Sequence, residues 1–409
     1  MTTAERLKRL SEELSSELQN GILPYWSTRM VDHEHGGFYG RIDASERLHP
    51  DSDRGVIMYA RILWAFSNAC NLYGDRSYLD IAERAKNYLF DHFLDQVNGG
   101  FFWMVDCNGN PVDTKKQIYA QGFVIYALSE YHRACSCPRS RQVAIETFEL
   151  IEKYAWDADN GGYIEACDRE WRPGEDMRLS EKETNHPKSM NTHLHVIEPC
   201  TNLYRIWPDG CLASRMRDIL EIFKTRIFNP ATDHFGLLFS SDWQPSSTDA
   251  SYGHEIEAAW LLDEAAEALA DQSLTDSTEA FTRRVAASAA QGLLADGSMA
   301  YEYSPTTGHL DAERHWWVQA EAVVGFFNLW QKTGQERYLD YVINAWEYIK
   351  AYLIDTVNGE WHWSRLPDGS LNPGKDKAGF WKCPYHNTRM CTELITRINS
   401  MLSRRLASV

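Results

Sequence analysis

The segment Asn98-Gly99-Gly100-Phe101 decides the fold of this 409-residue chain, because recognisable copies of it recur along the whole sequence. Each copy has a glycine-containing turn followed by an aromatic or apolar residue. The other five copies are His35-Gly36-Gly37-Phe38, Asn160-Gly161-Gly162-Tyr163, His234-Phe235-Gly236-Leu237, Asp296-Gly297-Ser298-Met299 and Asn358-Gly359-Glu360-Trp361. An internal repeat of this kind indicates an array of similar structural units.

The spacing of the glycines gives the size of the unit. From Gly36 onward the glycines lie 63, 62, 75, 61 and 62 residues apart, so the unit has about 62 residues and one copy carries an insertion. We place the insertion in the polar stretch 175–188, as a loop between the third glycine segment and the next helix. Two units still match residue by residue at an offset of 260, for example Val97-Asn98-Gly99 against Val357-Asn358-Gly359.

The residues between the glycine segments are typical of helices. Apolar side chains recur at helical spacing in residues 57–65 and again in residues 79–89, which predicts two helices per unit. The glycine segments themselves resemble short hairpins, because residues 101–105 run into Asn108-Gly109, a strong turn pair. The chain therefore contains six helix pairs with a hairpin between consecutive pairs.

Six helix pairs can stack as an open solenoid or close into a ring. An open array needs polar capping repeats at its ends, whereas residues 380–406 begin as aromatic and apolar as the interior helices. We therefore predict an all-α fold, an (α/α)6 barrel, which is a toroid of six helix pairs with short β-hairpins between them. Residues 1–409 are expected to form a single catalytic domain of this kind.

Composition excludes several classes of function. The chain has 41 Lys plus Arg against 58 Asp plus Glu, a net charge of −17, which argues against a nucleic-acid partner. No apolar stretch approaches the roughly 18 residues that a membrane span needs. The first residues lead directly into an amphipathic pattern without a signal peptide, and the nine Cys form no C-x-x-C pair. We expect a cytoplasmic protein with reduced thiols and no metal site.

In a closed ring, side chains at the start of each inner helix would line a central pocket. All six repeats place unusual residues there in the same phase, although an isolated inner His or Trp is more often part of a hydrophobic core. The 15 Trp of the chain also suit a sugar pocket, because flat indole faces stack on sugar C–H faces. The candidates, in chain order, are Arg61, Tyr119, Asn191 with His195, His254 with Glu257, Trp317 with Glu321, and Trp381 with His386.

The histidines among these candidates suggest acid–base chemistry. His193 and His195 are too far apart in angle to share a metal ion, because positions i and i+2 of a helix point about 160° apart. We expect His195, on the same face as Asn191, to reach the cavity and His193 to be structural. His254 and Glu257 share a face at i, i+3, a spacing that lets the carboxylate fix the tautomer of the imidazole. Several imidazoles around one cavity can exchange donor and acceptor roles near neutral pH.

Five separated motifs resemble those of a known family. They are residues 60–64 (ARILW), 189–195 (SMNTHLH), 252–257 (YGHEIE), 314–317 (RHWW) and 380–387 (FWKCPYHN). Together they look like the N-acylglucosamine 2-epimerase superfamily, and most like its members that act on β-1,4-linked disaccharides. The resemblance covers essentially the whole chain.

The resemblance implies a fold and an activity. It implies an (α/α)6 barrel and an isomerase of carbohydrate metabolism that converts the reducing-end glucose of cellobiose, or of a lactose-type substrate, into the C2 epimer. It also implies no metal or nucleotide cofactor, a small sugar as the only partner, and a monomer. The loop at residues 175–188 has no motif that matches the family, so the resemblance says nothing about a loop-based preference for one substrate.

The resemblance also implies roles for the candidate residues. His254 and His386 would be the acid/base pair on opposite walls, Glu257 would orient His254, and His195 would assist ring opening. Arg61, Asn191 and His195 would contact the reducing-end sugar. Trp317 and Trp381 would hold the sugar rings, and Tyr119 would line the same pocket. Glu321, one turn from Trp317, is a further candidate to bind the substrate. Independently of the family, inversion at C2 needs a proton removed from one face and returned to the other, and a cation such as Arg61 would stabilise the enediolate between these steps.

Several other functions remain open at this stage. The same superfamily contains aldose–ketose isomerases of the mannose/fructose type and monosaccharide 2-epimerases. The candidate residues distinguish a disaccharide 2-epimerase from these enzymes only weakly. A glycoside hydrolase would need two carboxylates flanking a glycosidic bond, and Glu257 and Glu321 are available, but three inner histidines are not what that mechanism needs. A non-catalytic sugar-binding protein would leave the paired histidines unexplained.

Overall fold

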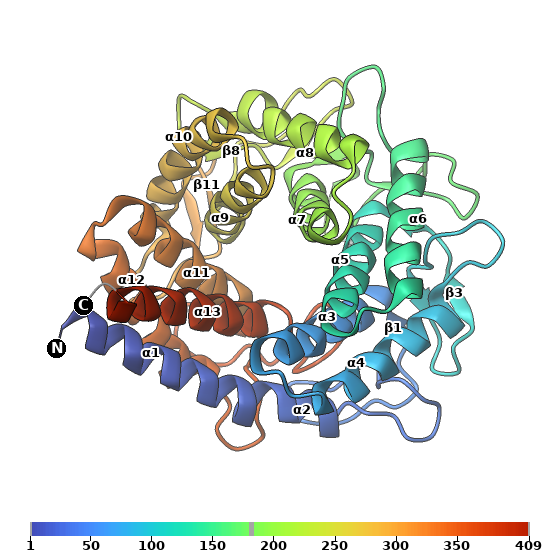
Figure 1. Cartoon of the computed structure of the whole chain (residues 1–409), viewed down its shortest axis with the longest axis horizontal. Helices are drawn as coiled ribbons and strands as arrows, with labels where there is room; N and C mark the ends of the chain where they lie inside the picture. Colours follow the sequence, from blue (N-terminus) through green and yellow to red (C-terminus); the bar gives the residue numbers. More distant parts are fainter. Residues whose placement is uncertain (1, 180–183, 408–409) are drawn as a thin grey trace.

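A computed structural model describes residues 2–179 and 184–407 and shows a ring of helices (Figure 1). Each of six inner helices contacts the next, and the last contacts the first, so the ring is closed. The inner helices are α3 (Val56–Tyr73), α5 (Ile118–Cys135), α7 (Met190–Ile206), α9 (Tyr252–Ala268), α11 (Trp316–Thr333) and α13 (His386–Ala407). The predicted (α/α)6 barrel is confirmed, and the closed arrangement replaces the open solenoid.

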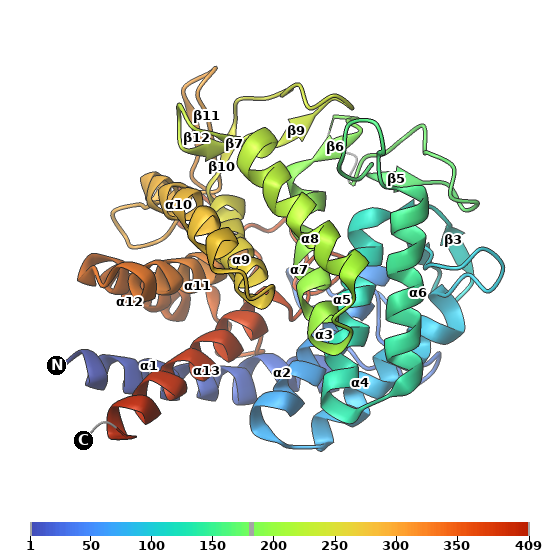
Figure 2. The same ribbon diagram turned by 45° about the horizontal axis from the view of Figure 1, so that its top comes forward.

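The outer helices surround this ring, and Figure 2 shows both layers from a second direction. Several outer helices end in a short π- or 3₁₀-helical turn. The outer layer consists of α1 (Thr3–Glu17) continued by η1 (Leu18–Ile22) and α2 (Leu23–Thr28), α4 (Ser77–Tyr88) with η2 (Leu89–Phe93), α6 (Pro138–Tyr154), α8 (Gly210–Ile222) with η3 (Phe223–Ile227), α10 (Gln272–Ala289) with η4 (Ala290–Gly292), and α12 (Glu336–Tyr348) with η5 (Ile349–Leu353).

The six glycine segments form the six predicted hairpin turns. Each turn closes an antiparallel bridge, and at Gly99 and Gly100 the backbone has φ of 73° and 67°, a region that favours glycine. The fourth turn includes β7 (Phe228–Asn229) and β8 (His234–Phe235). The bridged pairs are Val31 with Phe38, Leu94 with Phe101, Trp156 with Tyr163, Phe228 with Phe235, Leu293 with Met299, and Ile354 with Trp361.

Short strands join each repeat to the next around one end of the ring. The strand before an inner helix pairs with a strand that follows the hairpin of the next repeat, as β1 (Arg54–Gly55) does with β2 (Met104–Val105). The last repeat returns to the first through a bridge between Ile42 and Ala378. The other pairs are β4 (Lys116–Gln117) with β5 (Ala166–Cys167), β6 (Lys188–Ser189) with β9 (Leu238–Phe239), β10 (Ala250–Ser251) with β11 (Glu302–Ser304), and β13 (Arg314–His315) with β14 (Ser364–Arg365); β3 (Pro111–Asp113) and β12 (His309–Asp311) extend two of these sheets.

The fourth residue of five inner helices ties the helix to its own hairpin. Gln121 accepts a hydrogen bond from the Phe101 N–H at 2.9 Å and donates one to the Phe101 carbonyl at 2.8 Å. His193 does the equivalent in the third repeat, because its Nε2 accepts from the Tyr163 N–H at 2.9 Å while Nδ1 contacts the Ser189 carbonyl at 2.7 Å. His193 is fully buried and lies away from the central cavity, as the sequence predicted. Tyr59, Glu255 and Gln319 fill the same role in the other repeats.

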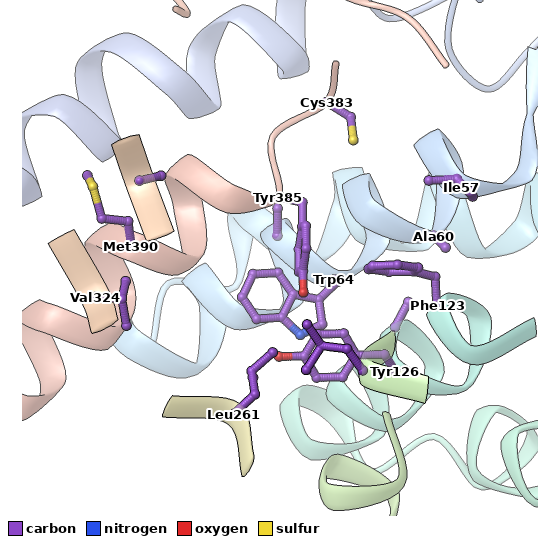
Figure 3. Close-up of a cluster of buried hydrophobic side chains, with 14 of the residues drawn as sticks. Ile57, Ala60, Trp64, Phe123, Tyr126, Leu261, Val324, Cys383, Tyr385 and Met390 are labelled. Atoms are coloured by element: carbon purple, nitrogen blue, oxygen red, sulfur yellow. The ribbon is translucent and has the colours of Figure 1, made fainter. Parts of the chain in front are cut away.

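A plug of aromatic side chains fills the ring in its middle (Figure 3). Trp64 stacks on Tyr126 with ring centroids 5.2 Å apart, and Tyr385 meets Trp64 edge-on at 5.4 Å. These rings come from α3, α5 and the segment before α13, so the plug joins repeats that are distant in sequence.

Two further sequence expectations concern the loop and the membrane. The loop predicted at residues 175–188 is present, although its residues 180–183 lie outside the described part of the chain. Within the described residues, no helix is both long and apolar enough to cross a bilayer. The organisation of residues 1–409 as a single domain stays a prediction.

Replacing His193 by Gln tests the role of this buried imidazole in folding. Burial lowers the pKa of His193 from 6.5 to about 4. The unfolded chain takes up a proton below pH 6.5 and the folded chain does not, so the wild type loses stability relative to His193→Gln as the pH falls. Urea unfolding at pH 7.0 and pH 4.5 should show the difference between the two free energies of unfolding shifting by roughly 2 to 3 kcal/mol in favour of the variant.

Glutamine suits this test because Gln121 and Gln319 already make the equivalent hydrogen bonds in other repeats. His309→Gln, which makes the same substitution at an exposed position of β12, serves as the matched control. Parallel stability curves for the wild type and His193→Gln would contradict a buried, neutral His193.

Candidate active site

The central cavity has a volume of about 910 Å³ and lies where the inner helices begin. This size is within the range of small-molecule sites. Nine of the ten candidate residues line it, and they come from six different repeats. They are Arg61, Tyr119, Asn191, His195, His254, Glu257, Trp317, Trp381 and His386.

Glu321, the tenth candidate, differs from its expected position. It is fully buried behind His386, with Oε1 at 2.7 Å from the imidazole Nδ1. Its other oxygen accepts a hydrogen bond from the Trp260 indole N–H at 3.2 Å. Glu321 was expected to contact the substrate, but these bonds make it an orienting group for His386 instead.

The three cavity imidazoles are each held through Nδ1. His386 bonds to Glu321, and His195 bonds to Glu198 Oε2 at 3.0 Å. Because a carboxylate accepts a hydrogen bond, Nδ1 carries the proton in both rings and Nε2 keeps its lone pair. His254 Nδ1 lies 2.8 Å from the hydroxyl of Ser251, which can donate or accept.

The predicted pairing of His254 with Glu257 is wrong. Glu257 bonds to Arg389 Nη2 at 2.5 Å, and its imidazole contacts are to His195 Nε2 and His386 Nδ1, both at 3.9 Å. A buried guanidinium needs a counter-charge more than a neutral imidazole does, and this draws the carboxylate inward. The expected pairing of a histidine with a glutamate three residues later occurs one repeat earlier, between His195 and Glu198.

Burial makes all three imidazoles neutral. It is the main cause that lowers the pKa of His254 to about 3. Burial together with Arg61 and Arg389 holds the pKa of His386 well below its usual value. Burial also lowers the pKa of His195, although Glu198 opposes the shift. Three neutral imidazoles therefore face one cavity as proton acceptors.

Arg61 supplies a positive charge to the same cavity. Its Nη2 donates to the Tyr119 hydroxyl at 2.8 Å, and its guanidinium lies 4.2 Å from the centre of the Phe123 ring. Among the described residues, no carboxylate lies within ion-pair distance of this guanidinium. A buried cation without an anionic partner is suited to an oxygen that becomes negative during a reaction.

Aromatic faces form much of the remaining wall. Trp317 lies against two of the imidazoles, with ring centroids 4.6 Å from His254 and 5.6 Å from His386. Trp381 lies 6.1 Å from Tyr119 and 5.9 Å from Trp103, which the sequence did not single out. The two predicted tryptophans are only partly buried, so their faces remain open to a ligand.

The backbone around His195 explains how its ring is positioned. Pro199 lies inside α7 and has no N–H to offer the carbonyl of His195 four residues earlier. A Cβ at Gly122 of α5 would lie only 2.3 Å from that carbonyl oxygen. A glycine is therefore required where α5 passes close to His195.

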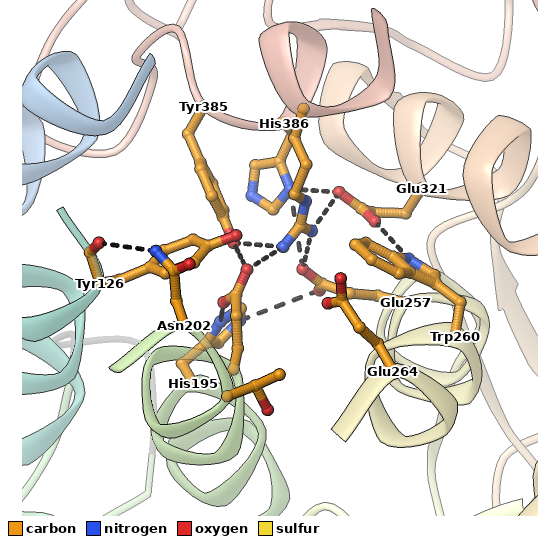
Figure 4. A network of polar contacts seen from close by, with 12 residues as sticks. Tyr126, His195, Asn202, Glu257, Trp260, Glu264, Glu321, Tyr385 and His386 are labelled. Carbon is orange, nitrogen blue, oxygen red and sulfur yellow. Dashed lines mark hydrogen bonds and ion pairs between the residues drawn. The ribbon is translucent and has the colours of Figure 1, made fainter. Parts of the chain in front are cut away.

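Arg389 is the main functional residue that sequence reasoning missed. Its Nη1 bonds to Glu198 and to the Tyr385 hydroxyl, and its Nη2 bonds to Glu257 at 2.5 Å and Glu321 at 2.6 Å. Figure 4 shows the carboxylates and imidazoles of this network converging from several inner helices. The sequence feature that could have identified Arg389 is its i, i+3 spacing from His386, which places both residues on one face of the same helix.

The same cluster includes a geometric arrangement that could hold a metal. Single ligand atoms of Glu257, Glu321 and His386 lie within 4.8 Å of one another. The Nη2 atom of Arg389 bonds to both carboxylates at Oε1, so their shared cation is a guanidinium. The donor set therefore fits Arg389, and it offers no reason to invoke an ion.

The loop after the third hairpin also reaches the cavity. Asp176, Arg178 and Leu179 line it, and the Gln117 side chain donates to the Met177 carbonyl at 3.2 Å. These residues could not be assigned from the sequence, because the position of a loop without a repeat pattern depends on its contacts.

Comparison with known proteins agrees with this geometry. The family described as N-acylglucosamine 2-epimerase (GlcNAc 2-epimerase) matches residues 37–389. Cellobiose 2-epimerase of Bacteroides fragilis is 51% identical over 386 residues, which cover 94% of this chain and 98% of the relative. D-mannose isomerase of Thermobifida fusca is 26% identical and covers 85% of this chain and 86% of its own.

The solved structures extend the similarity to three dimensions. The structure of cellobiose 2-epimerase from Spirochaeta thermophila superimposes with a TM-score of 0.92 at 38% identity, covering 98% of this chain and all of that one. The enzyme of the same name from Bacillus thermoamylovorans gives a TM-score of 0.91, also at 38% identity, over 95% of this chain and 100% of that one.

Proposed function

Because the chain belongs to the N-acylglucosamine 2-epimerase family, we propose that it inverts C2 of the reducing-end glucose of β-1,4-linked disaccharides, converting cellobiose to glucosyl-mannose. Its relatives named cellobiose 2-epimerase support this substrate class. The observation that carries the chemistry is the meeting of three neutral imidazoles and one unpaired guanidinium in a single cavity. Lactose-type disaccharides share the reducing-end glucose and are expected to react as well.

The reaction begins with opening of the sugar ring, because the C2 hydrogen becomes acidic only when C1 is an aldehyde. We assign this step to His195, whose Nδ1 is fixed by Glu198 and whose Nε2 is left to exchange a proton with the ring oxygen and the C1 hydroxyl. Tyr119 and Asn191 lie beside it on the cavity wall. Asn191 Oδ1 has no hydrogen-bond partner among the described residues, so it is available to a sugar hydroxyl.

Inversion at C2 then uses His254 and His386. One neutral imidazole accepts the C2 proton through Nε2, while the other, after taking a proton from solvent onto its own Nε2, donates that proton to the opposite face of the planar enediolate. The proton left on the first imidazole then returns to solvent. The two rings come from α9 and the first residue of α13, and both contact the ring of Trp317. Protons balance over the cycle, no electrons are exchanged, and no electron carrier is expected.

The negative oxygen of the enediolate is stabilised by fixed positive charge. Arg61 supplies a full charge, and the first turns of the inner helices direct backbone N–H groups toward this end of the ring. Trp317 and Trp381 offer their partly exposed faces to the two sugar rings. Glu257 and Glu321 are bound to Arg389, which argues against the paired free carboxylates that a glycoside hydrolase needs.

We also propose that the enzyme works as a monomer in the cytoplasm and takes only a small sugar as its partner. All nine cysteines are free thiols, which fits a reducing compartment. The acidic net charge of −17 opposes association with nucleic acid.

The products formed from cellobiose test the proposed activity. Incubation of the enzyme with cellobiose, followed by proton NMR of the anomeric region, should show a mannose-type reducing end on an intact disaccharide. A ketose would favour an aldose–ketose isomerase, and free glucose would favour a hydrolase. If cellobiose and lactose stay unchanged while mannose reacts, the disaccharide assignment is wrong.

Single substitutions of the acid/base pair test the mechanism. His254→Asn and His386→Asn should each lower kcat by roughly 10² to 10⁴ because each removes one proton-transfer group. Binding of cellobiose, followed by the fluorescence of the cavity tryptophans, should change little. His309→Asn on exposed β12 is the control and should keep native kcat. Near-native turnover by either cavity variant would refute the two-imidazole mechanism.

A further inference from the structure

We propose that Arg389 is a positioning residue that sets the tautomers of His195 and His386 together. It binds the two carboxylates that hold these rings, keeps both carboxylates as hydrogen-bond acceptors, and so leaves Nε2 of each ring to exchange protons with the sugar. The mechanistic consequence rests on the proposed function, whereas the tautomers themselves can be measured without any substrate.

The contacts of Arg389 link it to both rings. Its Nη1 bonds to Glu198 Oε1, while Glu198 Oε2 lies 3.0 Å from His195 Nδ1. Its Nη2 bonds at 2.6 Å to Glu321 Oε1, which also lies 2.7 Å from His386 Nδ1. One guanidinium therefore reaches two imidazoles, each through a single carboxylate.

The surroundings of Arg389 make its charge indispensable to these carboxylates. Three carboxyl groups, Glu198, Glu257 and Glu321, meet in a region with almost no exposure to water. Burial and the charge of Glu321 raise the pKa of Glu257 well above its usual value, and burial also raises the pKa of Glu321, although Arg389 opposes that shift. For Glu198 burial acts in the same direction, but Arg389 and His195 outweigh it and lower the pKa to about 2. Without Arg389, more of these carboxyls would bind protons.

A protonated carboxyl would change the tautomer of its imidazole. It could donate its O–H to Nδ1, and the ring would then carry its own proton on Nε2. The atom that faces the sugar would lose its lone pair. The planar guanidinium is suited to preventing this, because its two ends reach carboxylates on different helices, which a single ammonium group cannot do.

The third imidazole provides an internal control. His254 Nδ1 contacts the hydroxyl of Ser251, and no carboxylate of residues 2–179 or 184–407 links it to Arg389. Loss of Arg389 should therefore alter the ring protons of His195 and His386 and leave the tautomer of His254 unchanged. A general structural disturbance of the cavity would not distinguish among the three rings.

The experiment compares Arg389→Met with Arg397→Met. Arg397 lies two turns farther along α13 and also contacts the Trp260 ring, at 5.6 Å against 4.9 Å for Arg389, but it pairs with Glu393. In ¹⁵N–¹H spectra of the histidine rings, the wild type and Arg397→Met should show His195 and His386 protonated on Nδ1. Arg389→Met should shift both toward Nε2 protonation.

Activity should follow the tautomers. We expect kcat of Arg389→Met to fall about 10²-fold, the scale of a misplaced catalytic group, with the binding of cellobiose nearly unchanged. Arg389→Lys keeps the charge but cannot bridge both carboxylates, so it should recover part of kcat and disturb at least one of the two rings. If Arg389→Met does not fold, the same measurements on Arg389→Lys test the positioning role of Arg389.

Two results would overturn the positioning role. One is native kcat in Arg389→Met, or in Arg389→Lys if only that variant folds. The other is a loss of kcat while His195 and His386 stay protonated on Nδ1. If the wild type shows the expected tautomers but epimerises no sugar, the proposed function fails and the structural role of Arg389 stands.

Discussion

The burial of one positive charge organises the centre of this protein. Removing a guanidinium from water is costly unless carboxylates and hydrogen-bond acceptors replace its hydration. Arg389 obtains them from α7, α9 and α11, through Glu198, Glu257 and Glu321. The last inner helix is thereby tied to three others across the ring, and the two imidazoles bonded to these carboxylates take their orientation from the same cluster.

The closed ring makes that convergence possible. Strand pairing runs from each repeat to the next and returns from Ala378 to Ile42, so no repeat is left as an end. In the middle of the ring, Trp64, Tyr126 and Tyr385 pack together as an aromatic plug. Six first turns then surround one space, and each contributes side chains that lie far apart in the sequence. A proton acceptor can therefore stand on more than one side of a bound sugar.

The sequence predicted the parts of this arrangement that repeat. The glycine spacing predicted the helix pairs and hairpins, and the phase of the inner helices identified nine residues of the cavity wall. The prediction from the sequence was wrong where contacts cross the ring. Glu257 binds Arg389 instead of His254, and Glu321 lies behind His386. A periodic pattern specifies which face a residue occupies but not which distant charge it meets. For the same reason Arg389, Glu198 and the lining of the loop at residues 175–179 were missed.

The proposed mechanism removes a proton from one face of C2 and delivers a different proton to the opposite face. Proton NMR of cellobiose conversion in D₂O, sampled during the first turnovers, tests this directly, because an imidazole that returns the proton exchanges with solvent first. Glucosyl-mannose should carry deuterium at C2 from its first appearance, while unreacted cellobiose should still carry protium there. A product that retains protium at C2 would contradict proton transfer between two imidazoles.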